Sequence, residues 1–260
     1  MRAEHGDSGP TWKAGPRLAG LGRGLLDLLL PPSSLDGEAA LSGGLSASAF
    51  SKVTFLVDPV CDGCGLGLPY AEAAAERCPA CLARPRAFAR ARAACVYDEH
   101  SRDLILKLKH ADRTDLAGLF ARWLSRASAD LLAEADAVVP VPVHRARLLR
   151  RRYNQAAEIA RPLARATGLA YLPDALARKR DTASQGGKSA SGRRRNVAAA
   201  FAVPETRRAR VVGRRIVLVD DVLTTGATAE GCARALLAAG AASVTLSVVA
   251  RVTEMQARPI

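Results

Sequence analysis

The chain has 260 residues and a formal net charge of +13, from 38 Lys and Arg against 25 Asp and Glu. Its hydrophobic content of 49% is enough for a packed core and excludes global disorder. Aromatic residues make up only 4% of the chain, which disfavours a stacking platform for single-stranded nucleic acid. The positive excess favours a nucleic acid, an acidic lipid or a phosphorylated small molecule as partner, or else reflects a compositional bias toward Arg.

No stretch has the roughly 18–20 uninterrupted apolar residues that cross a bilayer. The apolar patch at 25–30 is interrupted by Asp27 and followed by Pro31 and Pro32, so it does not resemble a signal peptide. We therefore expect a cytoplasmic protein without membrane insertion. In that reducing compartment the six cysteines indicate metal ligands or free thiols rather than disulfides.

Three regions follow one another along the chain. Residues 1–50 are rich in Gly, Ser, Ala and Pro and predict a loosely ordered leader, residues 51–95 a cysteine-containing module, and residues 96–255 an α/β domain. Within the domain, apolar spacing predicts helices over 104–108, 116–132, 156–166 and 229–239 and strands over 137–143, 216–219 and 243–250. This alternation predicts a mostly parallel sheet flanked by helices.

Four cysteines form two C-x-x-C pairs, Cys61 with Cys64 and Cys78 with Cys81, separated by thirteen residues. Four thiolates at this spacing can close a tetrahedral shell around Zn²⁺, leaving no position for a catalytic water. The spacing therefore predicts a structural zinc site; two unrelated thiol pairs or an iron–sulfur cluster are the alternatives. The apolar surroundings of Cys95 and Cys232 predict buried core thiols.

The segment 216–228 combines a buried strand with polar residues that suit a phosphate. Four apolar residues are followed by Asp220 and Asp221, and then by a loop of Thr and Gly that enters a helix. Ligands of open α/β sheets bind at the carboxyl ends of strands, and a helix N-terminus offers free N–H groups to an anion. The Walker A pattern is absent. We interpret the segment as a sugar-phosphate site; the alternative is a plain turn capped by Thr.

This segment resembles the phosphoribosyl pyrophosphate (PRPP) motif of type I phosphoribosyltransferases. The resemblance implies that Asp220 and Asp221 hold the ribose hydroxyls and form the catalytic pair. It also implies a loop around the 5′-phosphate, so that the substrate-binding residues of the motif are Asp220, Asp221, Val222, Thr224, Thr225, Gly226, Ala227 and Thr228. Mg²⁺ would accompany PRPP.

Further motifs narrow the resemblance to the ComF family, which includes GntX-like proteins and joins a four-cysteine zinc module to a phosphoribosyltransferase domain. The stretch 139–144 followed by 151–155 is similar to the family's V-P-V-P and R-G-F-N-Q signature, which adds Arg151, Asn154 and Gln155 to the implied PRPP site. Arg193 joins them from a loop similar to the family's Q and R-x-x-N-V pattern. Arg152 replaces the usual Gly, and the further cysteine pair of some relatives is missing, so we expect one zinc site.

Two functions remain open at this stage. One is a PRPP-dependent transferase with Mg²⁺ and a structural zinc, whose basic clusters at 144–152 and 178–195 neutralise the leaving pyrophosphate. The other is a non-catalytic competence factor that engages single-stranded DNA or a helicase-like partner through the zinc module and Arg patches. The basic runs 84–92 and 207–215 fall outside the transferase interpretation and leave the DNA interpretation open. No segment identifies the acceptor or the oligomeric state.

Overall fold

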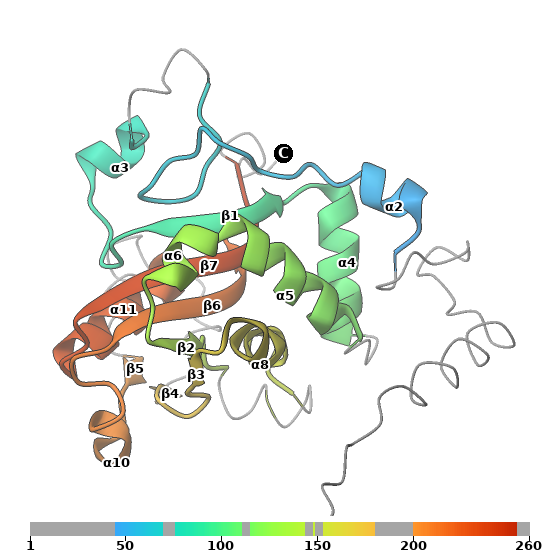
Figure 1. Ribbon diagram of the computed structural model, residues 1–260. Coiled ribbons are helices and arrows are strands. Elements are labelled where there is room, and N and C mark those ends of the chain that lie inside the picture. Colours follow the sequence, from blue (N-terminus) through green and yellow to red (C-terminus); the bar gives the residue numbers. More distant parts are fainter. Residues whose placement is uncertain are drawn as a thin grey trace, which may run out of the picture.

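The computed structural model describes residues 45–69, 76–110, 115–143, 148, 153–179 and 200–253 (Figure 1). Most of the predicted leader lies outside these residues. So do most of the two basic clusters expected near a pyrophosphate, including Arg151 and Arg193.

A five-stranded parallel sheet forms the centre of the chain. Its strands are β1 (Ala91–Val96), β2 (Ala137–Pro140), β3 (Ala170–Tyr171), β6 (Arg215–Leu223) and β7 (Ser243–Arg251). Their order is β1-β7-β6-β2-β3, and every pairing is parallel. The prediction of an α/β domain with a mostly parallel sheet is confirmed, and β6, the strand that carries the two aspartates, is the middle strand.

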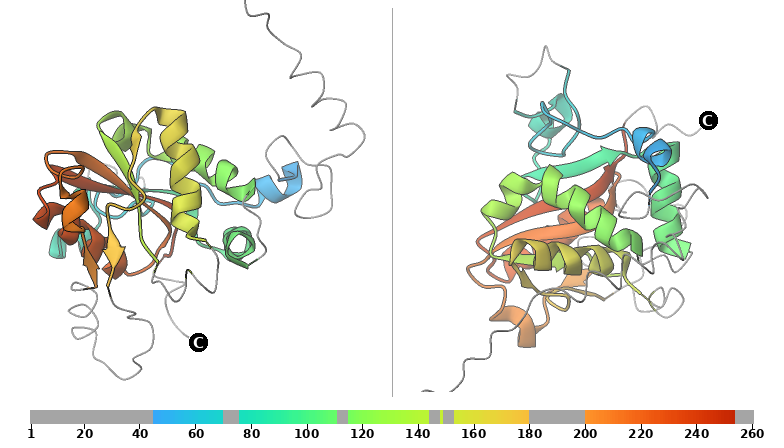
Figure 2. Two further views of the ribbon diagram at one scale, coloured as in Figure 1. Left: turned by 90° about the horizontal axis from the view of Figure 1, so that it is seen from below. Right: turned by 45° about the vertical axis from the view of Figure 1, so that its right-hand side comes forward.

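Helices cover both faces of this sheet, as parallel sheets require. One face packs against α4 (Glu99–His110), α5 (Asp115–Ala127) and α8 (Gln155–Thr167), and α6 (Ala129–Ala133) extends this layer. The other face packs against α11 (Ala227–Ala238). Figures 1 and 2 show the sheet between these two layers. Alternate residues of β6 serve the two cores, with Val217 and Val219 in one and Ile216 and Leu218 in the other.

The element boundaries differ from the predicted ones in ways that have physical causes. The predicted strand 216–219 continues through the aspartates to Leu223, because polar residues can continue a strand when its neighbour β7 is still there to pair with it. The predicted helix 116–132 is interrupted at Ser128, whose hydroxyl shares a buried hydrogen bond of 2.7 Å with that of Ser247. Strand β2 ends at Pro140, three residues before the predicted end.

Shorter elements complete the fold. They are α2 (Ala47–Ser51), α3 (Pro79–Ala83), α10 (Glu205–Arg208) and a small antiparallel pair, β4 (Ala177–Arg178) with β5 (Phe201–Ala202). The chain before the cysteines runs antiparallel to β1, bridging Phe55 to Cys95. Because β1 belongs to the main sheet, the predicted boundary at residue 95 falls within a strand. Among the described residues, no helix has both the length and the apolar character needed to cross a bilayer.

Candidate functional site

The carboxyl-terminal half of β6 places two aspartates on opposite faces of the sheet. Asp220 lies on the same face of the sheet as Leu218, the face that packs against α11. There it lines a small pocket together with Val248 of β7. Asp221 points to the other face, where its Oδ2 lies 2.6 Å from Nζ of Lys109 on α4. The Asp221 N–H donates to Oδ1 of Asp220 at 2.9 Å, so the two carboxylates remain neighbours.

The loop after β6 turns into α11 through a glycine in the left-handed region. Gly226 has φ +84° and is the residue that precedes the helix. Thr224 and Thr225 before it are exposed, and the Ala227 N–H lies 3.5 Å from Oγ1 of Thr225. A side chain at position 226 would be strained by this backbone conformation, so the tight turn depends on glycine.

The strand end, the loop and the first turn of α11 surround one polar pocket of about 60 Å³. Because a water needs roughly 10–15 Å³ on such a measure, the pocket accommodates a group of about the size of one phosphate. Seven of the residues predicted for the PRPP motif line it: Asp220, Val222, Thr224, Thr225, Gly226, Ala227 and Thr228. The sequence prediction therefore identified residues that come together in space.

Burial raises the pKa of Asp220 well above its ordinary value, and the neighbouring Asp221 carboxylate raises it further. The Asp221 N–H and the charge of Lys109 oppose this shift without cancelling it. Asp220 is therefore a carboxylate that is costly to ionise in the folded chain. A perturbed acid in a pocket at a strand end is typical of a functional site.

The next two predicted residues, Asn154 and Gln155, begin α8. The Asn154 side chain accepts the Ala156 N–H at 3.1 Å and donates from Nδ2 to the Val141 carbonyl at 3.0 Å. Asn154 is therefore the cap of α8 and ties this helix to the end of β2. Gln155 is 3% exposed, and its Nε2 is buried without a hydrogen-bond partner in the part of the chain that the structure describes. Such an unpaired donor requires an explanation, and a bound ligand is one.

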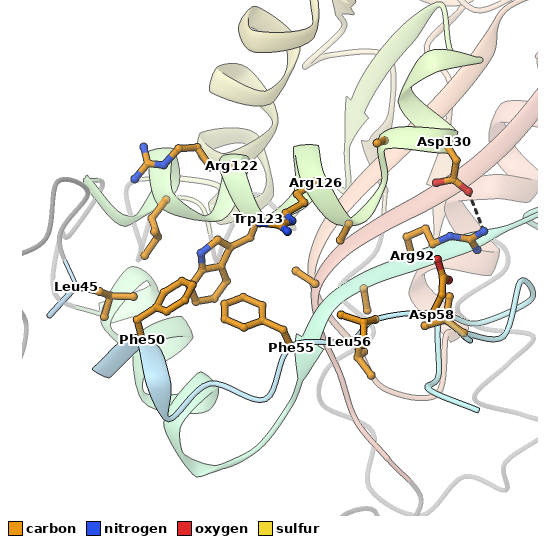
Figure 3. Close-up of a pocket in the computed structure, with 17 residues that line it drawn as sticks. Leu45, Phe50, Phe55, Leu56, Asp58, Arg92, Arg122, Trp123, Arg126 and Asp130 are labelled. Carbon is orange, nitrogen blue, oxygen red and sulfur yellow. Dashed lines mark hydrogen bonds and ion pairs between the residues drawn. The ribbon is translucent and has the colours of Figure 1, made fainter. Parts of the chain in front are cut away.

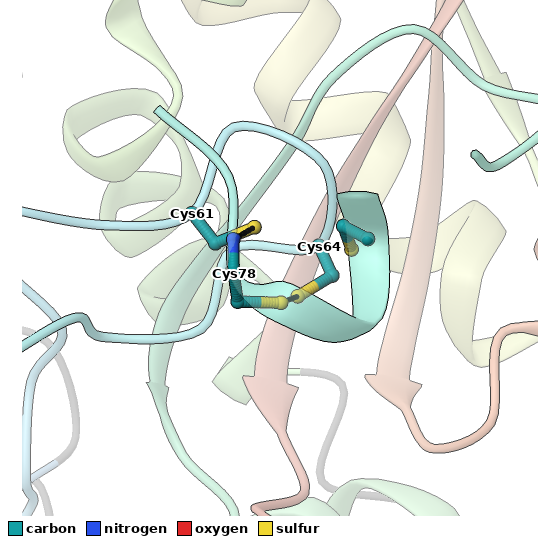
Figure 4. A group of neighbouring side chains, drawn as sticks. Cys61, Cys64 and Cys78 are labelled. Atoms are coloured by element: carbon teal, nitrogen blue, oxygen red, sulfur yellow. Dashed lines mark hydrogen bonds between the residues drawn. The ribbon is translucent and has the colours of Figure 1, made fainter. Parts of the chain in front are cut away.

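Cys61, Cys64, Cys78 and Cys81 come together as a second candidate site (Figure 4). Their sulfur atoms all lie within 4.8 Å of one another, and the Sγ atoms of Cys64 and Cys78 are 3.8 Å apart. Four sulfurs bound tetrahedrally to Zn²⁺, each about 2.3 Å from the ion, would lie about 3.8 Å from one another. All four side chains are buried and none is in a disulfide.

The surroundings of the cysteines fit a cation. Burial raises the pKa of the Cys64 and Cys81 thiols, and the neighbouring sulfurs contribute, so four thiolates need a bound positive charge to coexist. The Cys78 N–H donates to Sγ of Cys61 at 3.1 Å. Gly63 leaves room for the cluster, because a Cβ there would lie 2.9 Å from Cβ of Cys81. The donor set therefore fits a metal such as zinc.

The basic runs that left the DNA interpretation open are largely engaged in ion pairs. Arg84 and Arg86 contact Glu230, whereas Arg90 and Arg92 contact Asp62 and Asp130. In the second run, four arginines pair with nearby acids, namely Arg207, Arg208, Arg210 and Arg215 with Asp174, Glu205 and Asp136. Both runs therefore hold elements of the fold together.

A larger apolar groove of about 920 Å³ lies between α2, the segment 55–60 and α5 (Figure 3). Phe50 and Phe55 lie beside Trp123, with ring centroids 4.9–6.4 Å apart among the three, and Phe120 packs behind Trp123. Four of the eleven aromatic residues thus form one cluster, which the low overall aromatic content concealed. Arg122 and Arg126 of α5 line the same groove and are exposed.

Comparison with known proteins identifies the family. The DNA utilization protein YhgH of Escherichia coli K12 is 33% identical over 203 residues, which cover 76% of this chain and 86% of that protein. Competence protein F of Haemophilus influenzae is 31% identical over 198 residues, 74% of this chain and 85% of that protein. The chain belongs to the ComF family.

The comparisons also place a domain within this ComF chain. The sequence model described as "Phosphoribosyl transferase domain" matches residues 152–259, which include β6, the loop and α11. The four cysteines lie before it. Among solved structures, a glutamine PRPP amidotransferase from B. subtilis, complexed with ADP and GMP, has a TM-score of 0.39. It is 24% identical and covers 55% of this chain and 30% of that chain.

Proposed function

We propose that this ComF chain binds PRPP, or another ribose 5-phosphate ester, in the pocket between β6 and α11. The observation that carries the proposal is the convergence of seven residues of the PRPP motif on one polar pocket the size of a phosphate. The pocket lies at the carboxyl end of the middle strand of a parallel sheet and at the N-terminus of a twelve-residue helix. Both places favour an anionic ligand.

In this proposal each part of the site has a chemical role. The loop from Thr224 to Thr228 binds the 5′-phosphate with backbone N–H groups and threonine hydroxyls, and Asp220 and Asp221 accept hydrogen bonds from the ribose hydroxyls. Lys109 pairs with the Asp221 carboxylate at 2.6 Å and holds it in place. Arg151 and Arg193, outside the described residues, stay predictions for the pyrophosphate, as does Gln155 for a phosphate contact.

We further propose that the bound PRPP is turned over by phosphoribosyl transfer. The bond from the ribose C1 to the pyrophosphate oxygen breaks, pyrophosphate leaves with the electron pair, and the acceptor nucleophile forms the new bond to C1. Bound Mg²⁺ would supply neutralising charge to the leaving pyrophosphate. The chain itself needs to position the ribose and exclude water, which requires no nucleophilic side chain. A screen for pyrophosphate release over bases and amines would identify the acceptor.

Titration calorimetry with PRPP–Mg²⁺ tests the binding proposal. The double variant Asp220→Asn/Asp221→Asn keeps the shape of both side chains but removes their charge, and we expect it to bind at least about 30-fold more weakly, a loss of about 2 kcal/mol. The matched control is Asp174→Asn, which also removes a carboxylate but lies outside the pocket and should bind as wild type. Absence of binding by wild type, or equal affinity in the double variant, would reject the proposal.

We propose zinc as the metal of the four-cysteine cluster and a structural role for it. Four buried thiolates leave no open coordination position, so the ion would stabilise the module without taking part in a reaction. The module is in turn bonded to the domain through the ion pairs of Arg84, Arg86, Arg90 and Arg92. A cytoplasmic location stays a prediction.

The aromatic groove favours a second candidate function, binding of single-stranded DNA. Bases can pack on Phe50 and Phe55 while Arg122 and Arg126 contact phosphates, because every base has a face that stacks on aromatic rings. The names of the relatives, a DNA utilization protein and a competence protein, are consistent with such a ligand. A helicase partner stays a prediction without a specific surface among the described residues.

Anisotropy of a labelled oligothymidine, measured across salt concentrations, tests this second function. Arg122→Gln/Arg126→Gln should weaken binding and lower the slope of log affinity against log salt by about 1–2, as expected when one or two phosphate contacts are lost. The control is Arg207→Gln/Arg208→Gln, which removes the same charge from residues outside the groove. If both double variants behave alike, the groove is not the DNA site.

A further inference from the structure

We propose that Arg86 and Arg251 are positioning residues for the loop from Thr224 to Thr228, called the phosphate loop below. This inference rests on the function proposed above. The two arginines lie 165 residues apart in the sequence (251 − 86) and neither belongs to the PRPP motif. Together they hold three successive backbone carbonyls of the loop, those of Leu223, Thr224 and Thr225. We infer that these hydrogen bonds orient the loop so that its N–H groups face the ligand.

Arg251 holds the first two carbonyls. It is the last residue of β7, and its Nη1 donates to the Leu223 carbonyl at 3.1 Å and to the Thr224 carbonyl at 2.9 Å. The next N–H of the chain, that of Val252, also donates to the Leu223 carbonyl. The end of β7 thereby fixes the place where β6 stops and the loop begins.

Arg86 holds the third carbonyl from the side of the cysteine module. Its Nη1 donates to the Thr225 carbonyl at 2.7 Å and to Oε1 of Glu230 at 2.9 Å. The Glu230 side chain, on the first turn of α11, is 3% exposed and also contacts Arg84 and Arg234. A Cβ on Gly226 would lie 3.0 Å from the same Nη1, so glycine at this position also admits the arginine.

Because of the geometry of the peptide bond, hydrogen bonds to these carbonyls also fix the direction of the N–H groups that follow them. In a trans peptide the C=O of one residue and the N–H of the next point in opposite directions. Holding the carbonyls of Leu223, Thr224 and Thr225 against the two arginines therefore turns the N–H groups of Thr224, Thr225 and Gly226 away from them. Among the described residues these three N–H groups have no hydrogen-bond acceptor, and all three residues line the phosphate-sized pocket. Successive free N–H groups of this kind bind anions.

Both arginines also carry an unpaired buried donor. In the part of the chain that the structure describes, three buried side-chain nitrogen atoms lack a hydrogen-bond partner: Nε of Arg86, Nε of Arg251 and Nε2 of Gln155. Each such atom costs free energy, and native proteins tolerate few of them. Two of the three belong to the arginines behind the loop and the third to a residue predicted to contact PRPP. Unpaired nitrogen atoms on both arginines are expected where side chains are held for a ligand rather than for packing.

Binding of ribose 5-phosphate, measured by titration calorimetry, tests the inference, with PRPP–Mg²⁺ as a second ligand. Arg86→Gln and Arg251→Gln should each lower the affinity for both ligands about tenfold, because the freed carbonyls let the N–H groups turn from the phosphate. Arg86→Lys and Arg251→Lys, which restore a charged donor, should recover affinity to within about threefold of wild type. Arg84→Gln is the matched control, since Arg84 contacts Glu230 but no loop carbonyl, and it should bind as wild type.

The outcomes separate the inference from the function on which it rests. Wild type that binds neither ligand rejects both. Wild type that binds, with Gln variants that bind equally well, rejects the inference alone. Thermal unfolding of every variant accompanies the titrations. If Arg86→Gln fails to fold because Glu230 loses a partner, Arg251→Gln decides the question, since Arg251 has no carboxylate partner among the described residues. An equal loss of affinity in Arg84→Gln would show a general effect of loosening Glu230 and would also reject the role of Arg86.

Discussion

The four-cysteine cluster and the proposed phosphate loop each bring several polar groups to one point, but they use different atoms. The cluster is built from side chains, and four sulfurs converge because a short turn presents Cys61 and Cys64 and the start of α3 presents Cys78 and Cys81. The loop is built from backbone N–H groups, whose direction depends on where the opposite carbonyls are held. The cluster therefore needs only residues near it in sequence, whereas the loop depends on one arginine 139 residues before Thr225 and another 27 residues after Thr224.

This difference also shows how the two regions are joined. Arg86 follows Cys81 by five residues and reaches both Glu230 and the Thr225 carbonyl, so one side chain links the cysteine module to the phosphate loop. On the other side of the module, Arg90 and Arg92 each pair with both Asp62 of the module and Asp130 of α6. We expect the largest effects from changes within the cluster, smaller ones from changes at the loop, and the smallest from coupling between the two regions.

Removing two ligands should abolish the metal site. We expect Cys61→Ser/Cys78→Ser to lose the zinc, about one ion per chain, and to unfold at least about 3 kcal/mol more easily, because metal binding contributes directly to the folding of such modules. Elemental analysis and thermal unfolding measure both effects. Cys232→Ala, which alters a buried thiol outside the cluster, should keep its zinc. Zinc retained by the double serine variant would show that the cluster is not the site.

A methyl group added within the cysteine cluster should have the opposite effect on stability from one added on an ordinary helix. Gly63→Ala places a Cβ 2.9 Å from Cβ of Cys81, and we expect it to cost about 1–3 kcal/mol and to weaken zinc binding. In Gly118→Ala on α5 the nearest atom to the new Cβ is Nη1 of Arg122 at 3.9 Å. This control should stabilise the chain by about 0.5–1 kcal/mol, because alanine favours helices. Opposite signs in thermal unfolding are the expected result, and equal signs would contradict the account.

The chain should be stabilised by a substitution that disables the proposed phosphate site. Burial raises the pKa of Asp220 in the folded chain, so the stability contributed by its protonated form is complete below the unfolded-state pKa and is lost as the pH rises toward the folded-state pKa. Asp220→Asn, which stays neutral, should therefore gain stability over wild type progressively above about pH 4. At pH 8 we expect a gain on the order of 1 kcal/mol, or roughly 2–4 °C in melting temperature.

Asp221→Asn is the matched comparison for this pH dependence. It removes the carboxylate that is paired with Lys109 at 2.6 Å and should not reproduce the gain. A constant difference in stability between wild type and Asp220→Asn from pH 4 to pH 8 would contradict the raised pKa.

Coupling between the two regions should be the smallest effect. If Arg86 transmits the state of the cysteine module to the loop, removal of zinc with a chelator should weaken binding of ribose 5-phosphate about threefold, which is below 1 kcal/mol. Ribose 5-phosphate is the suitable probe because it can be tested without Mg²⁺, which the chelator would also bind. In Arg86→Gln the chelator should change the affinity no further. An equal effect of the chelator in both proteins would place the coupling elsewhere.

The sequence predicted features that follow from local patterns more completely than contacts between residues far apart in the chain. The parallel sheet, the four-cysteine cluster and the residues of the pocket followed from apolar runs, C-x-x-C spacing and one motif, because these patterns are local. Arg86 and Arg251 could not be recognised, since an arginine that binds a carbonyl has no local signature. In the run 84–92 the arginines resembled a nucleic-acid patch until Glu230, Asp62 and Asp130 were seen beside them.

The aromatic groove was missed for a related reason. A content of 4% aromatic residues describes the whole chain, whereas Phe50, Phe55, Phe120 and Trp123 gather from α2, the segment before β1 and α5 only when the chain folds. In contrast, the continuation of β6 through Asp220 and Asp221 could have been anticipated, because Val222 and Leu223 continue the apolar character of the strand. The two carboxylates are therefore held by the pairing of β6 with β7 rather than by a loop.

Backbone chemical shifts on addition of ribose 5-phosphate test the central claim most directly. In the ¹⁵N-labelled chain, we expect the largest shifts at the N–H groups of Thr224, Thr225 and Gly226, which line the pocket and have no acceptor among the described residues. Arg84→Gln should leave this response unchanged, and Arg251→Gln should diminish it. Saturable shifts confined to the loop and the first turn of α11 would agree with a phosphate bound at the end of β6. Shifts centred on Arg122 and Trp123 in the groove, or no shifts at the loop, would contradict it.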